Sequence, residues 1–304
     1  MTPRERGFLL LCGDLGDGMQ PLSLYQLELL RRRMTAAQPD GDPDAEITPA
    51  LLRSLGYRGS YALRLTALLD REDVLDSYLS LGAENGCHPL TCISDGFPQA
   101  LRVKLGRRCP AVLFYRGDLS LLRGRAVALT GSRRLEEGGR AFAERIGQLA
   151  AKQDCTLVSG NARGADKAAQ EACLQNGGRV IAVVSEPLAE QPAPAARLLY
   201  LAESGWHQEF SAQRALSRNR LIYALAEKSF VAQCAPGGGT FKGAGEALRH
   251  GISEIIANDD GSEGIAALRD LGAVLTKAEE ITDLFAFSPA QTAFFPEGEI
   301  TASE

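Results

Sequence analysis

Two short turns in the middle of the chain combine the residue types that hold phosphate groups. The first is Gly131-Ser132-Arg133, and the second is the segment Ser159 to Asp166, which contains Gly160 and Arg163. Each follows a short apolar run and precedes a helical pattern, as in a phosphate-binding strand–turn–helix unit. Glycine and serine let backbone N–H groups approach an anion, and the arginines add positive charge. Two such turns predict a site for a ligand with several phosphates.

A third turn of this kind lies further along the chain. Residues 236–240 contain three glycines, among them Gly239, and end at Thr240, so they predict another nest of backbone N–H groups. Lys242 falls in the first turn of the helix expected there, where a cation is unfavourable unless an anion lies beside it. A simple surface lysine explains this position equally well.

The segment Arg218-Asn219-Arg220 opens another helical pattern. Residues two positions apart on a helix point in different directions, so the two arginines are not expected to face one ligand. One of them is expected to hold the chain internally, and a solvated helix start is the alternative.

The sequence does not favour catalysis or metal binding. Its three histidines are dispersed, no nucleophile has a neighbouring base, and Asp166 reads as a structural carboxylate in the first turn of a helix. Seven scattered cysteines fit no zinc pattern and predict reduced thiols in a cytoplasmic protein. No apolar run reaches the roughly 18 residues of a membrane span, and we expect no signal peptide, no metal and no cofactor.

Charge is distributed unevenly along the chain. The net charge is −5, but residues 123–258 contain 17 basic and 13 acidic residues, an excess of +4. The remaining residues carry −9. The basic excess therefore coincides with the phosphate-type turns, which favours a polyanionic partner.

The elements that position these turns alternate between strand and helix from residue 125 onward. The predicted strands cover 125–131, 156–159, 179–184, 229–234, 253–257 and 273–276, with a short one at 206–210. The predicted helices cover 138–152, 166–176, 193–203, 218–227, 240–250, 262–270 and 278–285. This alternation predicts an α/β fold with a parallel sheet covered on both faces. The turns at 131–133, 159–166 and 237–240 should then meet at one edge of that sheet.

The chain is predicted to divide into three parts. Residues 1–95 have helical patterns at 22–33 and 70–82, a turn-rich loop at 38–44, and a helix start at Thr48 and Pro49. They form a small helical N-terminal domain in this interpretation. Residues 96–286 form the sheet domain, and residues 287–304 are expected to be a flexible tail.

An ordered set of motifs between about residue 90 and residue 286 resembles the DNA-processing protein A family, also called DprA or Smf. In chain order these motifs occupy residues 95–101, 109–118, 131–133, 159–166, 218–220, 238–240, 261–262 and 272–273. The chain departs from the family pattern in a shortened segment before Arg218, of which Glu209 is the remnant, and in Gln233, where an acidic residue is frequent. No winged-helix pattern follows Phe285, so we expect a divergent member.

The resemblance implies a Rossmann-like, doubly wound and mostly parallel sheet that binds single-stranded DNA without catalysing a reaction. It implies a protein that protects DNA or delivers it to a RecA-type recombinase in DNA uptake, natural transformation and recombination, usually as a homodimer. Arg133 and Arg163 would be basic DNA contacts. The full set of predicted nucleic-acid-binding residues is Gly131, Ser132, Arg133, Ser159, Gly160, Arg163, Asn219, Arg220, Gly239, Thr240 and Lys242.

Two other functions remain open from the sequence. Residues 236–240 are similar to the glycine motif of the lysine-decarboxylase-like phosphoribohydrolases, which cleave nucleotides. Gly243 stands where those enzymes carry a glutamate, and Glu246 comes too late. A nucleotide sensor in a defence or signalling system would also combine a helical domain with a ligand-binding sheet.

Overall fold

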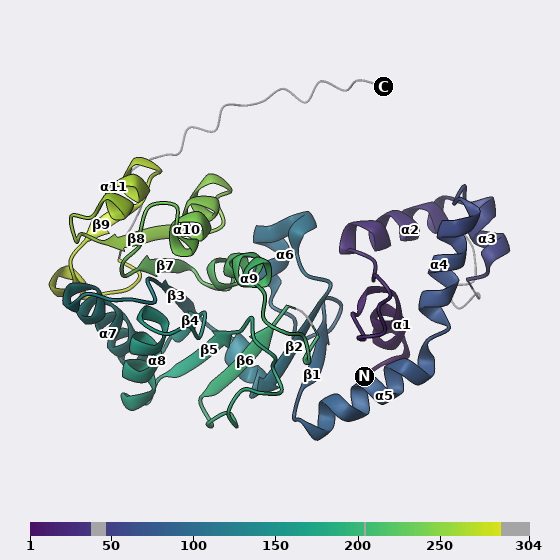
Figure 1. Cartoon of the computed structure of the whole chain (residues 1–304), viewed down its shortest axis with the longest axis horizontal. Helices are drawn as coiled ribbons and strands as arrows, with labels where there is room; N and C mark the ends of the chain where they lie inside the picture. The colour runs from purple at the N-terminus through teal and green to yellow at the C-terminus, as the bar shows by residue number, and fades with distance from the viewer. Residues whose placement is uncertain (38–46, 204, 287–304) are drawn as a thin grey trace.

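The computed structural model describes residues 1–37, 47–203 and 205–286, and within them nine strands form one sheet. The strand order is β1-β2-β6-β5-β4-β3-β7-β8-β9 (Figure 1). Pairing is parallel from β6 to β9, whereas β1 and β2 join the edge in antiparallel fashion. The strands are β1 His88–Thr91, β2 Val112–Gly117, β3 Ala126–Thr130, β4 Thr156–Ser159, β5 Arg179–Val183, β6 Leu198–Ala202, β7 Lys228–Val231, β8 Glu254–Asn258 and β9 Val274–Thr276. This confirms the predicted α/β fold with its mostly parallel sheet.

Helices cover both faces of the sheet because its central strands are apolar on both sides. In β3, Val127 and Leu129 pack against α7 (Glu137–Lys152) and α8 (Ala165–Gln175), whereas Ala128 joins the core on the opposite face. That second face carries α9 (Ala212–Leu225), α10 (Gly239–Arg249) and α11 (Glu263–Asp270), with α6 (Gln99–Leu105) beside α9. Short 3₁₀ helices η1, η2 and η3 occupy Gly106–Arg108, Leu119–Leu122 and Ala278–Glu280.

The order of the strands reverses between β3 and β7. From β3 the chain builds β4, β5 and β6 on one side, and α9 then returns it to β7 on the other side of β3. In open parallel sheets the connections leave a crevice at such a point, outside the carboxyl ends of the strands. The turn after β3 and the turn after β7 both lie at this crevice.

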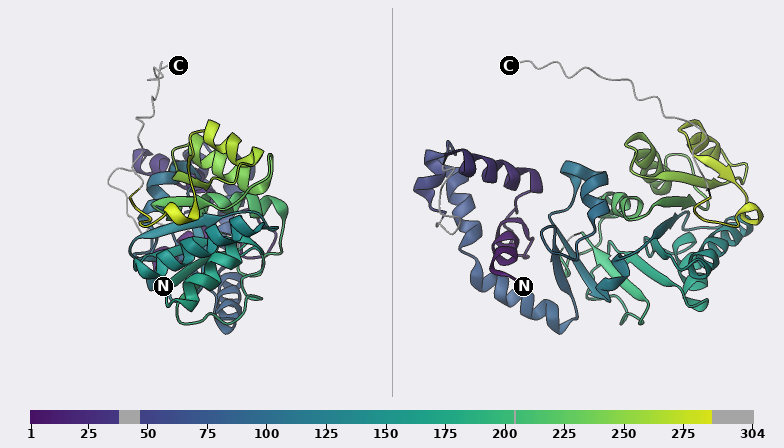
Figure 2. Two further views of the ribbon diagram at one scale, coloured as in Figure 1. Left: turned by 90° about the vertical axis from the view of Figure 1, so that its left-hand side faces the viewer. Right: turned by 180° about the vertical axis from the view of Figure 1, so that it is seen from behind.

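Among the described residues before the sheet there are five helices, with bounds α1 Pro3–Cys12, α2 Leu24–Ala37, α3 Pro49–Ser54, α4 Gly59–Leu69 and α5 Glu72–Glu84. Thr48 caps α3 as predicted, since its side chain accepts a hydrogen bond from the N–H of Leu51. The views in Figure 2 show α1 and α5 beside the edge of the sheet formed by β1 and β2. The Tyr78 hydroxyl on α5 accepts the N–H of Trp206 at 3.2 Å, which ties the helices to the loop after β6.

Several predicted elements are wrong. The segment expected to form a helix over 193–203 contains the strand β6 instead. Its apolar run Leu198–Ala202 is so short that periodicity alone does not distinguish a strand from a helix. No strand covers 206–210, and the helix expected over 278–285 is only the 3₁₀ turn η3. The sheet also begins earlier than predicted, with β1 at His88. The predicted loop at 38–44 and the predicted tail at 287–304 lie outside the described residues.

Candidate nucleic-acid interface

The three glycine turns meet at the crevice between β3 and β7, where they line a cavity of about 580 Å³. Hydrogen bonds join them directly. The Thr240 hydroxyl donates to the carbonyl of Gly131 at 3.0 Å, and the N–H of Ala165 donates to the carbonyl of Ser132 at 3.1 Å. The N–H of Ser132 in turn donates to the carbonyl of Gln233 at 2.8 Å. The predicted meeting of the turns is confirmed, and the cavity floor is one connected unit of backbone.

Glycine is required where these turns touch. A Cβ on Gly131 would lie 2.5 Å from the Cβ of Ala165, so any side chain would push the first two turns apart. Gly164 has a φ of +83°, and a Cβ there would lie 2.3 Å from the carbonyl oxygen of Ser132. Residues with a Cβ rarely adopt that backbone conformation, and a Cβ at position 164 would also collide with the backbone of Ser132.

Exposed cations surround this floor. Arg133 and Lys242 line the cavity, and Arg163 lines a smaller adjoining cavity of about 280 Å³ that also contacts Arg133. All three side chains are exposed, and within the described residues none of them forms an ion pair. Glu186, which also lines the smaller cavity, accepts hydrogen bonds from the N–H and hydroxyl of Ser185. The positive charge of Arg133, Arg163 and Lys242 is therefore available to an anion from solution.

Two buried groups of opposite charge, Arg218 and Asp166, also line the cavity. Arg218 is 6% exposed, donates to the carbonyl of Val183 at 2.8 Å, and covers Gly160 so closely that a Cβ there would lie 1.9 Å from its Nη1. Burial lowers the pKa of Arg218, and the charge of Asp166 opposes that change. Burial raises the pKa of Asp166 to about 6, although Arg218 and the N–H of Ala162 act against it. The charge of each group therefore partly offsets the cost of burying the other.

An apolar wall faces the cations. Phe210 and Leu216 line the cavity with 46% and 45% of their surface exposed. Large exposed side chains beside a cationic groove are typical of sites where nucleic-acid bases stack. The sequence pattern does not indicate either residue. It predicts Phe210 in a strand, and it predicts that the helix α9 starts at 218, six residues after its observed start at Ala212.

The structure brings most of the predicted site residues together. The residues that line the main cavity are Gly131, Ser132, Arg133, Asn219, Gly239, Thr240 and Lys242. Two predicted residues lie beneath it instead. Ser159 is fully buried and its hydroxyl accepts a hydrogen bond from Gln170 at 2.6 Å, and Gly160 lies under Arg218.

Arg220 requires a correction. It lies on the other side of α9, where it forms an ion pair with Glu203 and donates to Ser217. Arg218 lines the main cavity and Arg220 does not, but both arginines line a second cavity on the other side of α9, where they could face one ligand, unlike the prediction. The sequence could not distinguish them because the helix register is set by the cap at Ser211, whose side chain accepts the N–H of Arg214.

The described part of the chain has neither a metal-ligand cluster nor a helix that could span a membrane. No cluster of three or more histidine, cysteine or acidic residues there could bind a metal ion. The seven cysteines are free and buried. None of the described helices combines the length and apolar character needed to span a membrane.

A family model described as DNA recombination-mediator protein A matches residues 88–286, which include the whole sheet and all three turns. The chain belongs to this family. The DNA recombination-mediator protein A match begins at β1, so the five N-terminal helices lie outside it.

Individual relatives agree with this membership. The chain is 36% identical over 133 residues to DNA processing protein DprA of Streptococcus pneumoniae and 35% identical over 198 residues to protein Smf of Escherichia coli. These matches cover 41% and 59% of this chain, and 47% and 52% of the relatives. The chain therefore spans about half the length of the curated relatives it matches.

Solved structures extend the likeness to the fold. The X-ray structure of DNA processing protein A from Streptococcus pneumoniae superposes with a TM-score of 0.66 and 25% identity, over 86% of this chain and 92% of that one. A structure that describes the single-stranded DNA binding mode of DNA processing protein A from Helicobacter pylori superposes with a TM-score of 0.52 and 23% identity. It covers 62% of this chain and 90% of that one.

Proposed function

We propose that this chain binds single-stranded DNA in the cavity between β3 and β7 without cleaving it. The observation that carries the proposal is the combination, in one cavity, of three glycine turns, the exposed unpaired cations Arg133 and Lys242, and an apolar wall. Cations and backbone N–H groups suit the phosphates, and the apolar wall suits the bases.

The apolar wall favours a single strand over a duplex. In a duplex the bases stack inside the helix and leave phosphates and groove edges outside. Phe210 and Leu216 would then face only sugar and phosphate, which gain little from them. Unstacked bases of a single strand can lie against Phe210 while their phosphates reach Arg133 and Arg163.

The charged groups near the cavity favour binding over hydrolysis. Glu246, the nearest glutamate to the glycine motif in sequence, forms an ion pair with Arg108 at 2.7 Å and does not line the cavity. Asp166 does line it, but its carboxyl group is buried and accepts a hydrogen bond from the N–H of Ala162. The phosphoribohydrolase alternative needs a glutamate beside the glycine motif to meet the reacting atoms, and the described residues that line this cavity do not provide one.

Family membership supports the wider role. We propose that the chain hands its DNA to a RecA-type recombinase in the cytoplasm during DNA uptake and recombination, and that it acts as a homodimer. A member of the same family from Helicobacter pylori has a single-stranded DNA binding mode. Sedimentation of the protein with and without oligo-dT tests the dimer, and assembly of RecA filaments on DNA coated by a single-strand binding protein tests the delivery.

One titration series tests the main proposal. Labelled oligo-dT, a duplex of equal length and AMP are added to the protein, and released adenine is measured by chromatography. We expect oligo-dT to bind at least about tenfold more tightly than the duplex, since base stacking adds to the phosphate contacts. Equal affinity for the duplex, or catalytic release of adenine, would contradict the proposal.

A further inference from the structure

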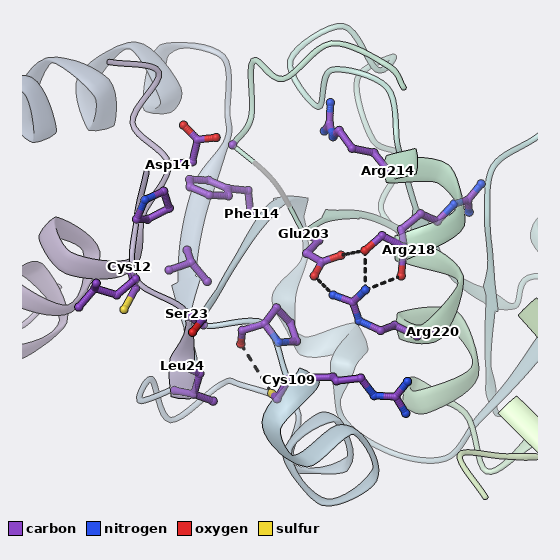
Figure 3. Close-up of a pocket in the computed structure, with 18 of the residues that line it drawn as sticks. Cys12, Asp14, Ser23, Leu24, Cys109, Phe114, Glu203, Arg214, Arg218 and Arg220 are labelled. Carbon is purple, nitrogen blue, oxygen red and sulfur yellow. Dashed lines mark hydrogen bonds and ion pairs between the residues drawn. The ribbon is translucent and has the colours of Figure 1, made fainter. Parts of the chain in front are cut away.

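A second cavity, of about 560 Å³, lies on the opposite side of α9 from the proposed DNA site (Figure 3). Its walls come from distant parts of the chain: Cys12, Asp14 and Pro21–Leu24 from the N-terminal region, residues 107–112 with Phe114, and the α9 side with Glu203. The N-terminal wall precedes residue 88, where the family match begins. The size suits a nucleotide or a similar small molecule.

The lining of this cavity is strongly cationic. Its two carboxylates are already engaged: Asp14 accepts a hydrogen bond from Gln208 at 2.8 Å, and Glu203 accepts from Arg220 and Ser217. Five arginines line the same cavity, namely Arg107, Arg108, Arg214, Arg218 and Arg220. A lining with this excess of positive charge attracts anions.

Three of these arginines, Arg107, Arg218 and Arg220, keep donors that no group in the described part of the protein uses. Arg107 forms no ion pair within the described residues, and its guanidinium lies 4.9 Å from the centre of the Tyr25 ring. Arg220 reaches Glu203 and Ser217 through its terminal nitrogens, as Figure 3 shows, while its buried Nε has no hydrogen-bond partner in the described chain. A buried donor without a partner costs free energy, so the arrangement is incomplete as it stands.

The N-terminal wall of the cavity adds the positively polarised end of a helix and an apolar surface. Leu24 is the first residue of α2, a 14-residue helix without an acidic residue in its first turn, and Ser23 beside it also lines the cavity. The partial positive charge of the helix end adds to the arginines. Leu22, Val112 and Phe114 supply apolar surface in the same cavity.

From these observations we infer that the cavity between the N-terminal helices and α9 binds the phosphate groups of a nucleotide. The nucleotide is either a free nucleoside diphosphate or triphosphate, or part of a DNA strand that continues past α9. Arg218 lines both cavities, so the two sites share a residue. The free nucleotide does not require DNA binding at the first cavity, whereas the continuing strand rests on the proposed function.

Calorimetric titration of the full chain with inorganic pyrophosphate and with ADP tests the site. Arg107→Gln should weaken pyrophosphate binding about tenfold, because it removes a charge-assisted contact. Arg102→Gln is the matched control, since Arg102 is an exposed arginine on the neighbouring α6 that does not line the cavity. Arg133→Ala reports on the first cavity: pyrophosphate bound there should be lost in Arg133→Ala, whereas pyrophosphate bound in the second cavity should be lost in Arg107→Gln. Arg107 is itself exposed, so its replacement should preserve the fold, which a thermal melt checks.

Oligo-dT of about six and about twenty nucleotides distinguishes the two sources of phosphate. Weaker binding of ADP by Arg107→Gln, with both oligonucleotides unaffected, identifies a free nucleotide. Weaker binding of the longer oligonucleotide alone identifies a continuing DNA strand. The inference is overturned if Arg107→Gln binds every probe as the parent does, or if Arg133→Ala is the variant that loses pyrophosphate. A failure of the proposed DNA site would give a different result: Arg133→Ala and Arg163→Ala would both bind oligo-dT as tightly as the parent does.

Discussion

The cavities on the two sides of α9 hold their arginines in different ways. Arg133 and Arg163 extend from glycine turns into solvent, with no ion pair among the described residues. In the second cavity, Arg108 and Arg220 are paired with Glu246 and Glu203. Free cations at a sheet edge attract any polyanion, and their contribution falls steeply with salt. Arg107 in that cavity forms no ion pair among the described residues, but Arg108 and Arg220 must exchange a carboxylate for a ligand, so the cavity is expected to select compact, highly charged groups.

The floors of the two cavities differ as well. Backbone turns that bond to one another form the first, while side chains from distant segments form the second. The first cavity should therefore be sensitive to any added Cβ, and the second to the loss of individual charges.

The largest expected effect is on stability, from Gly164→Ala. The new Cβ would combine an unfavourable φ with a collision against the Ser132 carbonyl. We expect the free energy of unfolding to fall by about 3 kcal/mol. Gly237→Ala is the control, because Gly237 has a φ of +69° but no atom within 4 Å of the added Cβ. Gly237→Ala should lower the free energy of unfolding, measured in urea, by only about 1 kcal/mol. Equal losses of stability in Gly164→Ala and Gly237→Ala would show that the turns do not press on one another.

Phe210→Ala should weaken oligo-dT binding about tenfold, since stacking is worth ~1–3 kcal/mol per base. Leu271→Ala controls for the loss of an exposed apolar side chain, because Leu271 is 42% exposed and does not line the cavity. With an abasic strand of the same length, Phe210→Ala and the parent should bind alike. A loss of affinity that is as large for the abasic strand would mean that Phe210 does not meet the bases.

A smaller effect should follow pH, because the Asp166 pKa is raised to about 6. Protonation removes a negative charge from the lining of the cavity, so oligo-dT affinity should rise a few-fold as pH falls through about 6. Asp166→Asn should flatten this dependence relative to the parent. The raised pKa also means that the folded state takes up the proton more readily, so this group's contribution to stability is present near pH 4 and lost as pH rises through about 6. An unchanged pH profile in Asp166→Asn would exclude this carboxyl group as the source.

Much of the first cavity could be predicted from sequence, since local patterns determine it. Apolar runs that end in Gly131 and Ser159 mark strand–turn–helix units, and parallel strands bring such turns to one edge. Where packing decides, prediction failed: Leu198–Ala202 was assigned to a helix, and Arg220 was chosen where the register of α9 turns Arg218 inward. The second cavity left no local signal, because its walls at Cys12, Arg107 and Arg214 are joined only by the fold.

The most direct test of the proposed DNA site is the salt dependence of oligo-dT binding for the parent, Arg133→Ala and Arg163→Ala. Each lost phosphate contact should make the slope of log K against log salt shallower by roughly 0.7. Arg134→Ala is the matched control, because Arg134 is an exposed neighbour that lines neither part of the DNA cavity. We expect shallower slopes for Arg133→Ala and Arg163→Ala and the parental slope for Arg134→Ala. Parental slopes for Arg133→Ala and Arg163→Ala would contradict the proposed DNA site.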